Sequence, residues 1–182
     1  MKLNEIQIST DDVFTGVILD VNKDTVRLPN GKTATRELIR HVGAVCVVPL
    51  TDDGKVIMER QFRYPMDEVI YEIPAGKLDS KSENPELAAR RELREETGYI
   101  PGKMTHLGLF YPAAAYSDER INMYLATELE KGETELDEDE FLDIEEVPLD
   151  ELVKLIADGK VPDGKTQAAI MRVAYMKEHG MI

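Results

Sequence analysis

The sequence has little cysteine, few basic residues for its acids and no long apolar run. Cys46 is the single cysteine, so no disulfide can form within one chain, and its place in the run GAVCVVPL is typical of a small buried core residue. A reducing, cytoplasmic location is therefore expected. No apolar run approaches the roughly 18 residues of a membrane helix, and the polar start MKLNEIQIST predicts no signal peptide.

The charge balance is strongly acidic. Aspartate and glutamate number 36 against 22 lysines and arginines, which gives a net charge of −14. Such a chain is poorly suited to bind nucleic acid or an anionic membrane. If its substrate is a phosphate ester, it must bind that substrate through metal ions and a few local arginines. The three histidines are scattered along the chain and suggest no site.

The length of 182 residues allows one full domain with a small extra element. Residues 1–40 read as a small β element, with strand candidates IQIS, TGVILDVNKDTVRL and RELIR and a hairpin turn at Pro29–Gly31. Residues 41–182 read as a mixed α/β domain. Its expected strands are 43–50, 55–63, 69–75, 104–111 and 121–129, and its late helices are 148–159 and 166–180.

The segment Gly76–Tyr99 carries the strongest local signals in the chain. Asn84 is a suitable N-cap and Pro85 a suitable first helical residue, while Gly98 stands where a left-handed residue ends a helix. We therefore predict a helix that begins at Pro85 and ends just before Gly98.

Three glutamates follow one face of that helix. Glu92 and Glu96 are four residues apart and Glu95 is three from Glu92, so all three project from one side. Like charges at this spacing repel by a few tenths of a kcal/mol per pair. Arg91 and Arg94 are expected on either side of the face, so a divalent cation held by oxygen ligands would supply the compensation. The alternative is a solvated surface helix.

The segment resembles the Nudix box, in which Gly, five residues, Glu and seven residues precede Arg-Glu-apolar-any-Glu-Glu-any-Gly-apolar. The matching residues are Gly76, Glu83, Arg91, Glu92, Leu93, Glu95, Glu96, Gly98 and Tyr99. The seven-residue spacing after Glu83 is kept, whereas six residues rather than five separate Gly76 from Glu83.

Flanking segments resemble the ADP-ribose pyrophosphatase branch of this family. They are LPNGK at 28–32, RELIRHVGAVCVVPL at 36–50, ERQFRYP at 59–65, EIPAGKL at 72–78, SDE at 117–119, DEDEF at 137–141 and DGKT at 163–166. The resemblance implies an α/β/α sandwich with a small N-terminal β element, and a magnesium-dependent enzyme that hydrolyses ADP-ribose to AMP and ribose 5-phosphate. The alternatives are GDP-mannose or another nucleoside diphosphate sugar as substrate, or a Nudix-fold module that binds a nucleotide without cleaving it.

The resemblance also implies roles for particular residues. The metal ion is expected to be magnesium, for which manganese can substitute. It would be held by Ala75, Glu92, Glu95 and Glu96. The implied catalytic residues are Glu95, Glu96, Glu138 and Glu140, although the acidic run around the last two also reads as solvated surface. The implied substrate-binding residues are Arg36, Arg63, Glu72 and Glu119. Glu83 and Arg91 would form an internal ion pair.

Two further features bear on partners. Ala113–Ala115 stand where the family typically has Ser-Pro-Gly, which is a departure next to the loop that carries Glu119. The β element at 1–40 resembles the segment that family members exchange between subunits, and a few short strands are rarely stable alone. A homodimer is therefore expected.

Overall fold

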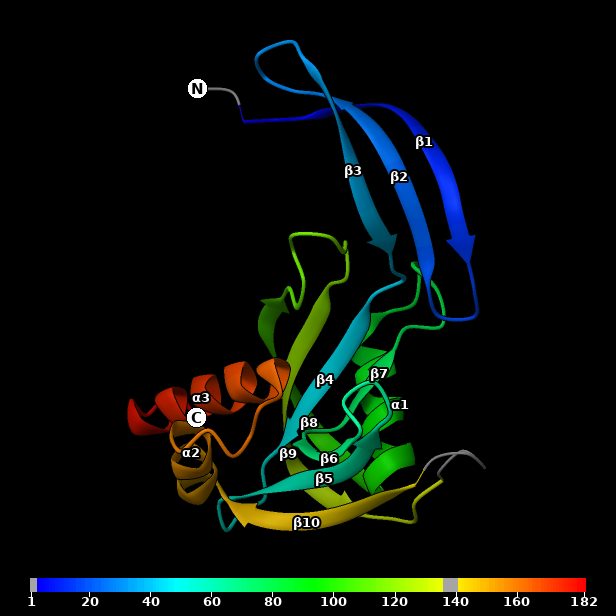
Figure 1. The fold of residues 1–182 in the computed structure, drawn as a ribbon. Coiled ribbons are helices and arrows are strands. Elements are labelled where there is room, and N and C mark those ends of the chain that lie inside the picture. The colour runs from blue at the N-terminus through cyan, green and yellow to red at the C-terminus, as the bar shows by residue number, and fades with distance from the viewer. Residues whose placement is uncertain (1–2, 136–140) are drawn as a thin grey trace. The chain divides into compact units, whose positions relative to one another are not determined.

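The computed structural model describes residues 3–135 and 141–182. It confirms the mixed α/β fold, with three sheets and three helices among these residues (Figure 1). The strands are β1 Ile6–Thr15, β2 Asp20–Arg27, β3 Thr33–Arg40, β4 Ala44–Pro49, β5 Lys55–Arg63, β6 Glu68–Glu72, β7 Ala75–Lys77, β8 Tyr99–Phe110, β9 Ile121–Lys131 and β10 Leu142–Pro148. The helices are α1 Pro85–Thr97, α2 Leu149–Ala157 and α3 Gly164–Glu178.

The chain forms two compact units. The first unit runs to Val42 and also includes the loop Tyr111–Arg120. The sequence prediction, which divides the chain after residue 40, places this loop in the second domain. In this unit β1, β2 and β3 form an antiparallel sheet. The predicted hairpin turn is present, and Gly31 adopts φ +84° there. The stretch TGVILDVNKDTVRL is not one strand, because a turn closed by Gly16 N–H to the Leu19 carbonyl (2.7 Å) interrupts it.

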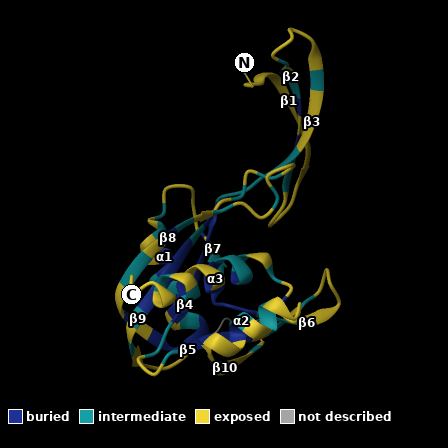
Figure 2. Ribbon diagram, turned by 90° about the vertical axis from the view of Figure 1, so that its left-hand side faces the viewer, coloured by how far each residue is buried: buried dark blue, intermediate teal, exposed yellow. Residues whose placement is uncertain are grey.

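The second unit contains two sheets, ordered β7-β4-β9-β8 and β10-β5-β6. All six residues of β4 are buried, and Figure 2 shows this strand in dark blue. Side chains alternate along β4, so Cys46 and Val48 face the core that α3 covers, and Val45 and Val47 face the other side. Helices α1 and α3 lie on opposite sides of β4 (Figure 1). This confirms the predicted sandwich.

Helix α1 has the predicted boundaries. The Asn84 side chain accepts hydrogen bonds from the backbone N–H groups of Glu86 (2.9 Å) and Leu87 (3.3 Å). Gly98 adopts φ +74° and donates its N–H to the Arg94 carbonyl. These two caps fix where the helix begins and ends.

Several elements differ from the sequence prediction, among them the stretch 69–75, which is divided between β6 and β7. Strand β10 was not predicted, because its sequence LDIEEVP is rich in acidic residues and shows no regular alternation of apolar and polar residues. Strand β8 begins at Tyr99 and runs through Pro101, which is tolerated because β8 is an edge strand and proline there removes no ladder bond. Helix α3 begins at Gly164, two residues before the predicted start at 166, with Asp163 as N-cap. Across the described residues, no helix is long and apolar enough to cross a bilayer.

Candidate functional site

Strands β5 and β6 bring acidic and basic side chains together on one face of their sheet. Glu59 and Arg63 are four residues apart on β5 and so point to the same side. Glu72 of β6 stands directly opposite Glu59 in the strand register, and it is buried like Glu59. The segment after Glu72 leads within three residues to Ala75, which contacts helix α1.

The glutamate face of α1 packs against this segment. The Ala75 N–H donates to Glu96 Oε2 at 3.1 Å, and Glu96 is only 5% exposed. A Cβ built on Gly76 would lie 2.0 Å from Glu92 Cδ, so glycine is required for the close approach of that carboxylate. The alternative of a solvated helix face is therefore wrong for Glu96.

Helical spacing predicts that Arg91 lies beside the acidic face. In the structure, Arg91 instead contacts that face. Its Nη1 lies 2.9 Å from Glu92 Oε1 and 3.1 Å from Glu95 Oε2, because its long side chain reaches both the next residue and the next turn. Its Nη2 lies 3.5 Å from Glu83 Oε1, so the two form an ion pair. Burial lowers the pKa of Arg91, but the charge of Glu92 and the hydrogen bond to Glu95 outweigh it and hold that pKa above its usual value.

The carboxylates of α1 are oxygen donors of the kind that Mg²⁺ prefers. Within residues 3–135 and 141–182, no three His, Cys, Asp or Glu side chains are already arranged around a common metal position. The Arg91 guanidinium is the cation that stands between Glu92 and Glu95 in this structure.

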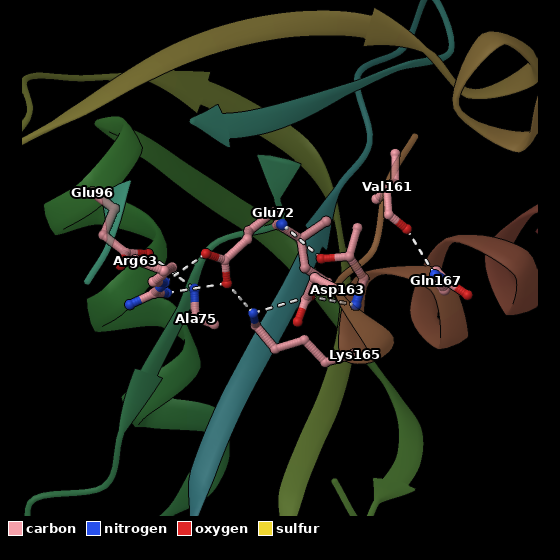
Figure 3. A network of polar contacts seen from close by, with 10 residues as sticks. Arg63, Glu72, Ala75, Glu96, Val161, Asp163, Lys165 and Gln167 are labelled. Atoms are coloured by element: carbon pink, nitrogen blue, oxygen red, sulfur yellow. Dashed lines mark hydrogen bonds and ion pairs between the residues drawn. The ribbon is translucent and has the colours of Figure 1, made fainter. Parts of the chain in front are cut away.

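A four-residue charge network lies beside Ala75 (Figure 3). The Arg63 guanidinium donates to both oxygens of Glu72, at 2.6 Å and 3.0 Å. Lys165, from the first turn of α3, binds the same carboxylate and also donates to Asp163 Oδ2 at 3.0 Å. Burial lowers the pKa of Lys165, but the negative charges of Glu72 and Asp163 outweigh it and raise that pKa, so Lys165 is a buried cation.

Sequence reasoning missed three of the side chains that the structure brings here: Glu59, Asp163 and Lys165. Glu59 begins the stretch ERQFRYP and the other two belong to DGKT; both stretches carry the family resemblance, but it implied no role for these three residues. Glu59 could have been noticed as the first charged residue after the apolar run VIM of a predicted strand.

Glu59 is an unusual carboxyl group. It is buried, and its Oε1 atom has no hydrogen-bond partner within the described part of the chain. Burial raises its pKa to about 8, against the opposing effect of a hydrogen bond with Glu96, and the charge of Glu72 raises it further. Because a hydrogen bond between two carboxyl groups needs a proton, the Glu59–Glu96 pair retains one proton near neutral pH.

The sequence also predicts four other site residues. Arg36 and Glu119 belong to the first unit, where Arg36 Nε donates to Glu5 Oε2 at 2.9 Å and Glu119 Oε1 lies 4.0 Å from His41 Nδ1. Glu138 and Glu140 lie outside the described residues.

Comparisons with known proteins agree on one family. The family described as NUDIX domain matches residues 40–169, and the Nucleoside diphosphate sugar hydrolase N-terminal domain matches residues 5–39. The chain is 46% identical to an ADP-ribose pyrophosphatase of Bacillus subtilis over 93% of this chain and 92% of the relative. It is 44% identical to a methanol dehydrogenase activator of Bacillus methanolicus over 91% of this chain and 90% of the relative. A solved ADP compounds hydrolase superposes with a TM-score of 0.86 over 100% of both chains at 24% identity, which supports the fold.

Proposed function

This chain belongs to the Nudix hydrolase family, and we propose that it hydrolyses the pyrophosphate bond of ADP-ribose to give AMP and ribose 5-phosphate. One observation carries the proposal. The buried carboxyl of Glu96 meets Ala75, three residues after a second buried carboxylate, Glu72, which binds Arg63. Acidic groups suited to hold a metal and a guanidinium suited to bind phosphate thus meet at one short segment, which supports the proposed cleavage of a diphosphate. The ADP-ribose pyrophosphatase at 46% identity supports the choice of substrate.

The residues at this place fit a divalent cation, which we propose is magnesium, or manganese in its place. The Ala75 carbonyl and the carboxylates of Glu92, Glu95 and Glu96 would hold it. Gly76 supports this assignment because its missing Cβ leaves room for the Glu92 carboxylate. When bound, the cation would neutralise phosphate charge and make a bound water easier to deprotonate. Arg91 can release Glu92 and Glu95 without losing its counter-charge, because Glu83 remains as a partner.

Hydrolysis adds water across the bridging P–O bond of the diphosphate. The attacking water gives a proton to a carboxylate as that bond breaks, and the two phosphate monoesters leave. We propose Glu95 and Glu96 for this proton transfer and for the placement of the water, with Glu138 and Glu140 as further acids from the acidic run. A carboxylate acts in such a role when it lies within hydrogen-bond reach of the water.

We propose that Arg63 and Glu72 bind substrate, and we propose Arg36 and Glu119 as further substrate-binding residues. The Arg63 side chain is 40% exposed and uses Nε and one terminal nitrogen for Glu72, which leaves further N–H groups for a phosphate or a purine face. We expect Arg63→Ala to raise KM more than it lowers kcat if Arg63 binds substrate and transition state alike. Arg60→Ala is the matched control, since Arg60 lies three residues earlier on β5 and faces the opposite side.

A substrate panel tests the proposal. We expect a higher kcat/KM on ADP-ribose than on ADP-glucose, GDP-mannose or nucleoside triphosphates at saturating Mg²⁺. A higher kcat/KM on GDP-mannose would replace ADP-ribose as the assigned substrate. Binding of ADP-ribose without turnover of any compound would identify a non-catalytic nucleotide-binding module.

We also propose that the protein is a cytoplasmic homodimer in which residues 1–40 form the dimerisation element. Strand β1 is exposed along all ten residues. Its exposed apolar side chains are Ile6, Ile8, Val13 and Phe14. Exposed apolar groups gathered on one short sheet are typical of an interface. Light scattering that gives a monomer mass at micromolar protein would contradict this proposal.

A further inference from the structure

We propose that the first turn of α3 is a positioning element for the metal-binding segment, in which Lys165 and Thr166 hold residues 72–75 so that Ala75 meets Glu96. The inference rests on the proposed function, because it assumes that Ala75 and Glu96 hold the cation. It assigns a role to two residues of α3, a helix that lies on the opposite side of β4 from the glutamate helix α1.

Two neighbouring contacts tie α3 to this segment. The Lys165 ammonium binds Glu72 Oε2, and the Thr166 hydroxyl accepts a hydrogen bond from the Ile73 N–H at 3.1 Å. Two residues further along the chain, the Ala75 N–H donates to Glu96 at 3.1 Å. The first turn of α3 and the glutamate face of α1 therefore both contact residues 72–75, from two sides (Figure 3).

The α3 turn is itself rigid. Asp163 caps the helix, since its Oδ2 accepts the Thr166 N–H at 2.9 Å, and the same oxygen accepts from Lys165 at 3.0 Å. Thr166 is fully buried, and the Lys165 side chain is 11% exposed. Lys165 and Thr166 are therefore enclosed and held in place. We expect the loss of either contact to displace residues 72–75 rather than the α3 turn.

Charge makes Lys165 the more important of the two residues. Glu72 is buried, and it receives one cation from β5, Arg63, and one from α3. Without Lys165, Glu72 would depend on the half-exposed Arg63 alone, and Asp163 would lose its own ion pair. Removal of one member of a buried ion pair leaves an uncompensated charge, which the segment relieves by moving toward solvent. Ala75 would then leave its place beside Glu96.

The first test measures Mn²⁺ binding to the metal-free protein by isothermal titration calorimetry, with no substrate present. Lys165→Met and Thr166→Val should weaken binding by about 10- to 100-fold, the range found when groups that orient metal ligands are removed. Thr166→Ser, which keeps the hydroxyl, should bind as the wild type does. Lys160→Met is the matched control, because Lys160 is ion-paired to Asp158 at 3.8 Å but is 66% exposed. Wild-type affinity in folded Lys165→Met and Thr166→Val would overturn the inference.

The second test needs no variant, so it decides the matter even if a substitution prevents folding. Amide hydrogen exchange of the wild-type protein is compared with and without saturating Mn²⁺. Positioning by α3 predicts slower exchange on metal binding both in residues 72–77 and in residues 163–168, with no change in residues 171–178 later in α3. Slower exchange in 72–77 alone would overturn the inference.

The outcomes separate this inference from the proposed reaction. Wild-type protein that binds Mn²⁺ but cleaves none of the panel would refute the reaction and leave the positioning role supported by the binding data. Wild-type protein that binds no Mn²⁺ would overturn the metal assignment and the positioning role together.

Discussion

Replacement of Glu59 by glutamine should remove a pH dependence of stability that the wild-type protein carries. Glu59 is buried, its Oε1 has no hydrogen-bond partner among the described residues, and burial raises its pKa to about 8. Between the ordinary carboxyl pKa of 4.5 and about 8, the folded chain therefore holds a proton that the unfolded chain has released. A glutamine at this position stays neutral at every pH, because its amide needs no proton uptake, and that amide can either donate or accept in the contact with Glu96.

The sign and size follow from proton linkage. A group whose folded pKa is raised stabilises the fold most below its unfolded pKa, and that contribution is lost as the pH rises through the folded value. One proton of difference changes the free energy of unfolding by about 1.4 kcal/mol per pH unit. From pH 5.5 to 7.5 this amounts to about 2 to 3 kcal/mol, or roughly 5 to 10 °C in Tm for a protein of this size.

Thermal unfolding followed by circular dichroism at pH 5.5, 6.5 and 7.5, in EDTA, measures this effect. We expect the Tm of Glu59→Gln to rise relative to the wild-type Tm as the pH increases. Glu178→Gln, a surface substitution on α3, should follow the wild-type curve. A Tm difference between Glu59→Gln and wild type that stays constant across the three pH values would refute the reasoning.

Three further substitutions or treatments test the site and the core. Glu96→Gln should abolish turnover and leave the circular dichroism spectrum unchanged, because the amide keeps the size and the acceptor for Ala75 N–H while removing the charge; a wild-type rate at saturating Mg²⁺ would contradict the metal assignment. Gly76→Ala should lower kcat by at least about tenfold and cost about 1 to 3 kcal/mol of stability in urea unfolding, since its Cβ meets the Glu92 carboxylate; unchanged kinetics would contradict that clash. Cys46 should resist Ellman's reagent at pH 8 in the native protein and react in urea, because burial raises its pKa to about 12; rapid native labelling would show an open core.

The features predicted well from the sequence are those fixed by near neighbours along the chain. The helix α1 begins and ends where Asn84 and Gly98 predict, because caps depend on a few adjacent residues. The three glutamates share a face because helical spacing alone decides it. The strand β5 has the predicted bounds of 55–63, since a turn precedes an apolar run there.

The features that sequence reasoning missed depend on contacts between distant segments. Lys165 and Glu72 are 93 residues apart, and nothing near Lys165 in the chain marks it as buried beside a carboxylate. Strand β10 exists because it pairs with β5, although its own sequence reads as acidic surface. The contact of Arg91 with Glu95 was missed for another reason, since helical spacing gives the direction of Cβ but not the reach of a long side chain.

The charge network explains how so acidic a protein can present a cation to a phosphate. A net charge of −14 repels a dianion, but salt largely screens this repulsion at separations beyond about 10 Å. Within the network, the cations Arg63 and Lys165 are balanced by Glu72 and Asp163, so the cluster is neutral as a whole. Its two ends differ in burial, because Lys165 is enclosed while Arg63 is half exposed. Arg63 and Lys165 share one carboxylate, Glu72, so Glu72 does not fully neutralise the Arg63 guanidinium. The Arg63 guanidinium is also the cation of the network that faces solvent, and it can therefore bind a diphosphate.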